Sequence, residues 1–218
     1  MDAWFAEASA FTPPYMLVMS RFGDIDLYFD ADRGEDGIAL FEELSAQLQG
    51  PMAMFVPMGA LNVAIELEDV DQAREAHARA VESMESLQLE MLRGPLVSGE
   101  AKIDELDGDF ASAAEKYRTV AGTDPTQDFN TQIGRALVGA GQFDEAKTAL
   151  EEALRLSPSS PRAHFQMARV LEQQGDVAAA IEHLDAALVA WENADEVFGP
   201  AREAREKLAE LRPVAEGS

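Results

Sequence analysis

The sequence predicts an all-α protein built from stacked antiparallel helix pairs and closed by a further helix at its C-terminal end. Three observations predict this fold. Gly108, Gly141 and Gly175 recur at spacings of 33 and 34 residues, which indicates a repeat array. From Met52 onward, the apolar residues follow the helical period. No segment shows the alternation of apolar and polar residues that is typical of strands.

Residues 1–50 are expected to form an irregular helical region. The first twenty residues are acidic where a secretory signal is basic, and Pro13 and Pro14 interrupt their apolar run, so we expect mature protein here. Two apolar stretches follow, YMLVMSRFGDIDLYF and IALFEELSAQL. Their spacing is irregular, so a worn repeat and a separate functional element both stay open.

Residues 51–92 are predicted to form a degenerate helix pair. Ala73 and Ala80 have the spacing that alanines show in the later units. Glu68 stands where those units have the turn glycine, and Leu61 stands where they have a small residue. The fold of a unit is therefore expected here without its usual turn chemistry.

Three regular units are predicted at residues 93–126, 127–160 and 161–194. Each has a turn glycine, which takes a positive φ without steric cost, and a small residue before it that lets the paired helices approach closely. The small residues are Ala101, Gly134 and Ala168. Pro125 and Pro158 should end the second helices. Gly94, Pro95 and Gly99 predict a kink or a late start in the first helix of the first of these units.

This order of small residue, turn glycine, aromatic residue, alanines and closing proline resembles the tetratricopeptide repeat family, in its bacterial type. The resemblance is close over residues 130–188 and weaker over residues 101–125. It implies a solenoid, because one helix pair cannot bury its apolar face alone and the units must stack.

A capping helix is predicted over residues 195–213, followed by a tail at 214–218. The segment WENADEVFGPAREAREKLAEL resembles the segment that closes such arrays in larger bacterial proteins, with Trp191, Ala194 and Asp195 as its distinctive residues. Pro200 suits a first helical turn. One apolar stripe then runs along the helix through Ala201, Ala204, Leu208 and Leu211.

Composition narrows the function. The 218 residues carry a net charge of -24, which argues against nucleic acid and anionic membrane surfaces as partners. Cysteine is absent from the sequence, which excludes a disulfide framework and a thiolate nucleophile. The apolar run at residues 52–65 contains Pro57 and is too short to span a membrane. A soluble, cytoplasmic protein is expected, and whether its acidity reflects a high-salt environment stays open.

No catalytic, cofactor or metal site is predicted. His77, His164 and His183 stand in no triad or metal motif, so we interpret them as ordinary helical histidines. The strongest competing pattern lies at residues 32–43.

In that segment Asp32, Asp36, Gly37 and Glu43 match four positions of a calcium loop, but Gly34 stands where an oxygen ligand is required. A flexible acidic connection explains the same residues, and a calcium-dependent switch or an enzyme built on the first fifty residues is kept as a third hypothesis.

The resemblance also implies a binding surface, because the first helix of each tetratricopeptide unit lines a concave groove. The residues that follow the small residues would point into it as a cation ladder of Lys102, Arg135 and Arg169. Asn62 holds the corresponding place upstream, and further contacts are expected at Gln132, Arg162 and Gln166. Pairs within one helix, Lys102 with Glu105 and Arg169 with Glu172, are the alternative.

The function predicted is a non-enzymatic scaffold that binds a partner peptide or helix, with carboxylates facing the ladder. The alternative is a regulatory or assembly module of a larger signalling system of the kinase or cyclase type, whose catalytic unit lies elsewhere, because the closing segment resembles theirs.

Overall fold

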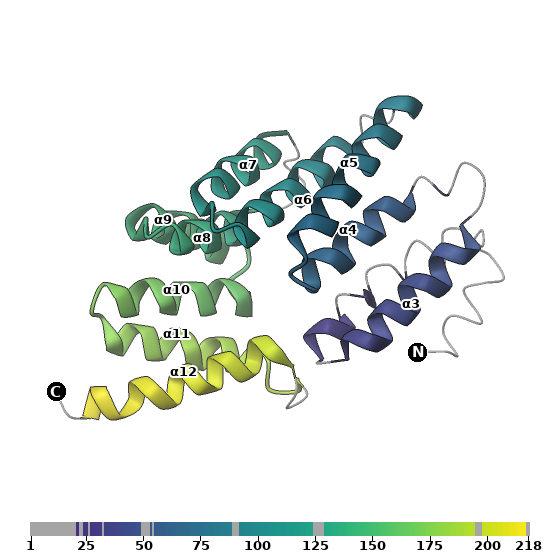
Figure 1. Cartoon of the computed structure of the whole chain (residues 1–218). Helices are drawn as coiled ribbons and strands as arrows, with labels where there is room; N and C mark the ends of the chain where they lie inside the picture. The colour runs from purple at the N-terminus through teal and green to yellow at the C-terminus, as the bar shows by residue number, and fades with distance from the viewer. Residues whose placement is uncertain are drawn as a thin grey trace. The chain divides into compact units, whose positions relative to one another are not determined.

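The structure, a computed structural model, describes residues 21, 24–25, 27–31, 33–48, 53, 55–88, 92–123, 129–194 and 198–216 (Figure 1). Within these ranges the regular elements are helices and no strand is found, which confirms the predicted all-α fold. Contacts divide the chain into two compact units, residues 1–93 and 94–218, and each is described by itself.

Among its described residues, the first unit has three helices longer than ten residues. They are α3 (Gly34–Gln47), α4 (Val56–Glu66) and α5 (Val70–Leu87). Leu40 and Leu44 of α3 are buried in one core with Ile25 and with Val63 of α4, so the irregular first fifty residues do contribute a packed helical layer. The pair α4 and α5 pack against each other as the degenerate unit requires.

The second unit is an array of hairpins followed by a single helix. Its helices are α6 (Arg93–Leu106), α7 (Phe110–Thr123), α8 (Asn130–Gly139), α9 (Phe143–Leu156), α10 (Pro161–Gln173), α11 (Val177–Ala190) and α12 (Gly199–Glu216). The sequence predicted a kink or a late start for α6, and the late start is wrong because the helix begins at Arg93. Gly94 and Pro95 lie in its first turn, where proline costs nothing because the first backbone N–H groups of a helix have no partner within it.

Each hairpin turns on a residue in the left-handed backbone region. Gly108, Gly141 and Gly175 have φ values of 79°, 71° and 81°. Glu68 occupies the same place between α4 and α5 with φ 54°, although an L side chain is disfavoured there by about 1 kcal/mol or more. The degenerate unit therefore keeps the geometry of the glycine turn and lacks the glycine.

The residue after the turn often caps the next helix. The carboxylate of Asp69 accepts from the backbone N–H of Gln72 at 3.0 Å, and Asp109 and Asp176 accept in the same way at 3.1 Å at the starts of α7 and α11. Such caps satisfy an N–H that has no partner within the helix. These aspartates are a repeat feature that was not predicted from the sequence.

Replacing Glu68 with glycine is therefore expected to stabilise the protein. Glu68→Gly should remove the strain of the left-handed conformation, and part of the gain is lost to the greater freedom of glycine in the unfolded chain, leaving about 0.5–1 kcal/mol. Chemical denaturation measures the effect. Gly141→Ala, the reverse change at an equivalent turn, should cost about 1 kcal/mol; equal effects of the two changes would contradict this explanation.

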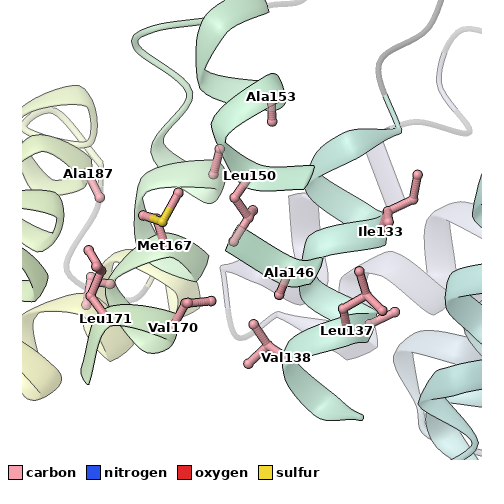
Figure 2. Close-up of a cluster of buried hydrophobic side chains, with 14 of the residues drawn as sticks. Ile133, Leu137, Val138, Ala146, Leu150, Ala153, Met167, Val170, Leu171 and Ala187 are labelled. Carbon is pink, nitrogen blue, oxygen red and sulfur yellow. The ribbon is translucent and has the colours of Figure 1, made fainter. Parts of the chain in front are cut away.

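Close helix contact inside the second unit depends on glycine at two positions. A Cβ atom at Gly134 would lie 2.5 Å from the Leu150 side chain of α9, and one at Gly139 would lie 2.5 Å from the Phe110 ring of α7. Gly134 was predicted as a small packing residue, and Gly139 was not. Figure 2 shows side chains of α8, α9 and α10 gathered in one cluster, among them Leu137, Leu150 and Val170.

Helix α12 covers the end of the array, as predicted. It packs against α11 and lies next to that helix in Figure 1. Its whole predicted stripe is buried: Ala201 and Ala204 are 0% exposed, and Leu208 and Leu211 are 7% exposed. Phe198, just before the helix, meets the Trp191 ring edge-on, with the ring centroids 5.9 Å apart.

Among the described residues, none of the helices combines the length and the apolar character that crossing a membrane requires.

Candidate functional site

The predicted groove residues all lie on first helices of helix pairs. Six belong to the second unit: Lys102 on α6, Gln132 and Arg135 on α8, and Arg162, Gln166 and Arg169 on α10. Asn62 lies half-buried on α4, in the first unit, and is treated apart from the others.

Arg135 is held by a carboxylate from the preceding helix pair of the same unit. Its Nε and Nη2 atoms donate to the two carboxylate oxygens of Glu105 on α6, at 3.2 and 2.6 Å. The Tyr117 hydroxyl of α7 donates to the same carboxylate at 3.3 Å. The Glu105 side chain is 14% exposed and that of Arg135 is 40% exposed. Side chains from three helices, Glu105 of α6, Tyr117 of α7 and Arg135 of α8, thus form one polar cluster.

Burial shifts the pKa values of the two acidic groups in this contact, Glu105 and Tyr117. It raises the pKa of Glu105 above its ordinary value, and the charge of Arg135 and its hydrogen bond only partly oppose the shift. Burial is also the largest cause of the raised pKa of Tyr117. The alternative was a pair of Glu105 with Lys102 within one helix; Glu105 contacts Arg135 instead, and the charge of Lys102 acts on it from a distance.

Arg169 has a different environment. Its Nη1 atom donates to Oε1 of Gln166, one turn earlier on α10, at 3.1 Å, and Gln166 is 7% exposed. Glu172, its predicted alternative partner, binds Nζ of Lys207 on α12 at 3.0 Å. Across the described part of the chain no ion pair is found for Lys102 or Arg169, so these two members of the cation ladder keep donors for a ligand.

The remaining predicted contacts differ in exposure. Arg162 is exposed at the start of α10. Gln132 is half-buried on α8, and its side-chain oxygen is buried with no hydrogen-bond donor among the described residues.

A cleft lies between α10 and α12, which we call the end cleft. Its volume is about 350 Å³, and it is lined by Phe165, Arg169, Glu203, Glu206, Lys207 and Glu210. The sequence placed Arg169 in a groove but did not connect it with the acidic face of the capping helix. A heptad-like spacing of Glu203, Glu206 and Glu210 along α12 was the available signal.

The calcium-loop alternative is wrong at three of its four matched positions. Asp36, Gly37 and Glu43 all lie in the continuous helix α3, which cannot wrap around a cation as a loop does. Glycine has another role at this place, because Cβ atoms at Gly34 and Gly37 would lie 3.0 Å from opposite edges of the Phe29 ring. Asp32 lies outside the described residues, and within those residues no cluster of three or more potential metal ligands is found.

Two histidines that the sequence treated separately form a pair. His164 Nε2 lies 2.9 Å from the carbonyl oxygen of Pro158, and His164 Nδ1 lies 2.9 Å from His183 Nδ1. A carbonyl can only accept, so Nε2 of His164 carries the proton and its Nδ1 accepts from His183. The pair joins α10 to α11. Burial and the nearby His164 lower the pKa of His183, while Glu182 opposes the shift.

Stability should therefore decline in mild acid. A lowered pKa means that the folded state favours neutral His183, so its contribution is present above the ordinary value of 6.5 and is lost as the pH falls through the folded value. Melting temperatures measured between neutral and mildly acidic pH should fall less for His183→Asn than for the native chain. His77→Asn, in the other unit, is the control; the same pH dependence in all three proteins would contradict the assignment.

Comparison with known proteins agrees with the helical array. The family model "Tetratricopeptide repeat" matches residues 131–195, which contain α8 to α11. A curated relative, the tetratricopeptide repeat and J domain-containing co-chaperone DNJ1 of Cryptococcus neoformans, is 32% identical over 81 residues. That match covers 37% of this chain and only 16% of the relative.

Solved structures share the fold at low sequence identity. PilW, a type IV pilus biogenesis factor, is 17% identical with a TM-score of 0.60, covering 93% of this chain and 95% of PilW. Yeast Tom70 is 15% identical with a TM-score of 0.57, covering 98% of this chain and 46% of Tom70. The kinesin light chain TPR-like repeats of Podospora anserina are 16% identical with a TM-score of 0.55, covering 84% and 99%. Residues 131–195 therefore match the tetratricopeptide repeat family, and the helix pairs of the chain share the fold of these solved structures.

Proposed function

We propose that the protein is a non-enzymatic scaffold that holds an extended or helical segment of a partner protein against α6, α8 and α10. The observation that carries this proposal is the placement of Lys102 and Arg169 at equivalent positions of two first helices, each without an ion pair among the described residues. Cations without ion pairs, placed at repeat spacing, form a surface on which one partner segment can contact successive first helices. The tetratricopeptide match and the shared solenoid fold support the same class of function.

The partner segment carries carboxylates in this proposal. Arg169 suits carboxylate recognition because its planar fork can donate two parallel hydrogen bonds, and its contact with buried Gln166 restricts its orientation. Arg135 contributes less, since Glu105 already occupies its Nε and Nη2 donors. Affinity is expected to be about micromolar, because a peptide must be ordered on a shallow surface.

The proposal is tested by selecting binders from a displayed library of random dodecapeptides with the full chain, and measuring their affinity by fluorescence anisotropy. Arg169→Glu should lower the affinity of the protein for the selected peptides at least tenfold, about 1.4 kcal/mol, because an attractive charge becomes repulsive.

The matched control is Arg155→Glu. Arg155 lies on the second helix α9 and is exposed, and within the described part of the chain its ion pair is with Glu152, one turn away. It should leave affinity within about twofold, as exposed pairs of this kind contribute little. Equal losses for the two variants, or no selected binder, would contradict the proposed function.

A further inference from the structure

The walls of the end cleft are fixed by the protein core. Lys207 of α12 binds Glu172 of α10 at 3.0 Å, and Arg212 of α12 binds Asp185 of α11 at 3.0 Å. Between these ion pairs the buried side chain of Leu208 anchors α12 in the array. These contacts hold α12 against the array, so the side chains of α10 and α12 that line the cleft have a defined position.

The charges within the cleft divide into paired and unpaired groups. Lys207 is engaged on both sides, by Glu172 and by Glu210 at 3.4 Å, and the hydrogen bond to Glu172 is the largest cause of its raised pKa. Arg169 remains on the α10 wall, and Glu203 and Glu206 remain on the α12 wall. No ion pair is found for any of these three among the described residues. A cation and two carboxylates thus line one cavity without neutralising one another.

We infer that the end cleft binds a partner segment that carries a carboxylate and a basic side chain together. The carboxylate faces Arg169, the basic group faces Glu203 and Glu206, and the aliphatic stem of the basic residue lies on Phe165. The volume of about 350 Å³ suits side chains and not a folded domain. This inference rests on the proposed function, because the occupant is part of the same partner.

Charge complementarity favours this occupant over the simpler ones. A purely acidic segment would bring its carboxylates beside Glu203 and Glu206, and a purely basic one would bring its cations beside Arg169. A helical segment presents an acidic and a basic residue on one face when they are three or four positions apart. The cleft then distinguishes partner segments by the order of their charged residues as well as by their net charge.

The test uses the full chain and a peptide taken from the dodecapeptide selection. In the protein, Glu203→Gln and Glu206→Gln are combined, which removes both charges and keeps the length of the side chains. In the peptide, the basic residue and the acidic residue are each replaced by glutamine in turn. Affinities of all combinations form two double-mutant cycles.

We expect the doubly substituted protein to bind the native peptide about tenfold more weakly and to show no further loss when the peptide lacks its basic residue. Arg169→Gln should behave in the same way toward the acidic residue. Coupling of Arg169 with the acidic residue, but none of Glu203 and Glu206 with the basic one, would overturn this inference and leave the proposed function intact. Selected peptides without basic residues would also overturn it. Absence of coupling at Arg169 would instead count against the proposed function.

Discussion

Removal of residues 197–218 should lower the melting temperature by roughly 10 °C and promote self-association. The deletion takes away Leu208 and Leu211, which are 7% exposed, and uncovers Leu184 and Trp191 on the end of the array. Burial of each leucine contributes about 1.5–3 kcal/mol. A solenoid needs a polar end cap, because an open apolar end is a surface for other molecules. Thermal unfolding and light scattering measure the two effects.

A point substitution separates this packing effect from the loss of chain. Leu208→Ala should cost about 2–5 kcal/mol of unfolding free energy, because it leaves a cavity in the core. Leu156→Ala, at a leucine that is 51% exposed, should cost far less. Similar costs at both positions, or an unchanged melting curve for the truncated protein, would show that α12 does not stabilise the array.

Replacement of Arg135 should also destabilise the fold. Arg135→Met leaves the Glu105 carboxylate, 14% exposed, without its cation and without two hydrogen bonds. The expected cost is about 1–3 kcal/mol, reduced from the value for a fully buried pair because the Arg135 side chain is 40% exposed. Arg155→Met at the exposed pair with Glu152 should change stability by less than about 0.5 kcal/mol.

The effect of Arg135→Met should depend on pH in a defined direction. Burial already holds the pKa of Glu105 above its ordinary value of 4.5, so ionisation of this residue lowers the free energy of unfolding. Loss of Arg135 makes that decrease larger. The destabilisation should therefore be full at neutral pH and shrink as the pH falls toward 4.5. A difference from the native chain that grows on acidification would contradict a role for the Glu105 contact.

The repeat architecture could be predicted from the sequence because its causes are local. A turn glycine, a buried alanine and an apolar stripe each act within one helix pair, and Gly141, Ala146 and Leu208 occupy the places that these rules require. The role of the N-terminal glycines could not be predicted, because Gly37 matches a calcium loop by spacing alone while Gly34 departs from it. Their small size instead accommodates the Phe29 ring.

The groove could be predicted only in outline. Repeat spacing placed Lys102, Arg135 and Arg169 on first helices, but the partner of each cation depends on side chains from other helices. Glu105 could reach Lys102 within its helix or Arg135 on the next unit, and sequence spacing does not separate these options. The cleft at Arg169 needed the position of α12, which lies beyond the repeats.

The central claim is that a partner segment lies along the first helices of the array. Amide chemical-shift mapping with a selected dodecapeptide on the full chain tests it most directly. The largest changes should fall on α6, α8 and α10 around Lys102 and Arg169, with small changes on the second helices α7, α9 and α11. A map centred on those second helices, with α10 unaffected, would contradict the claim.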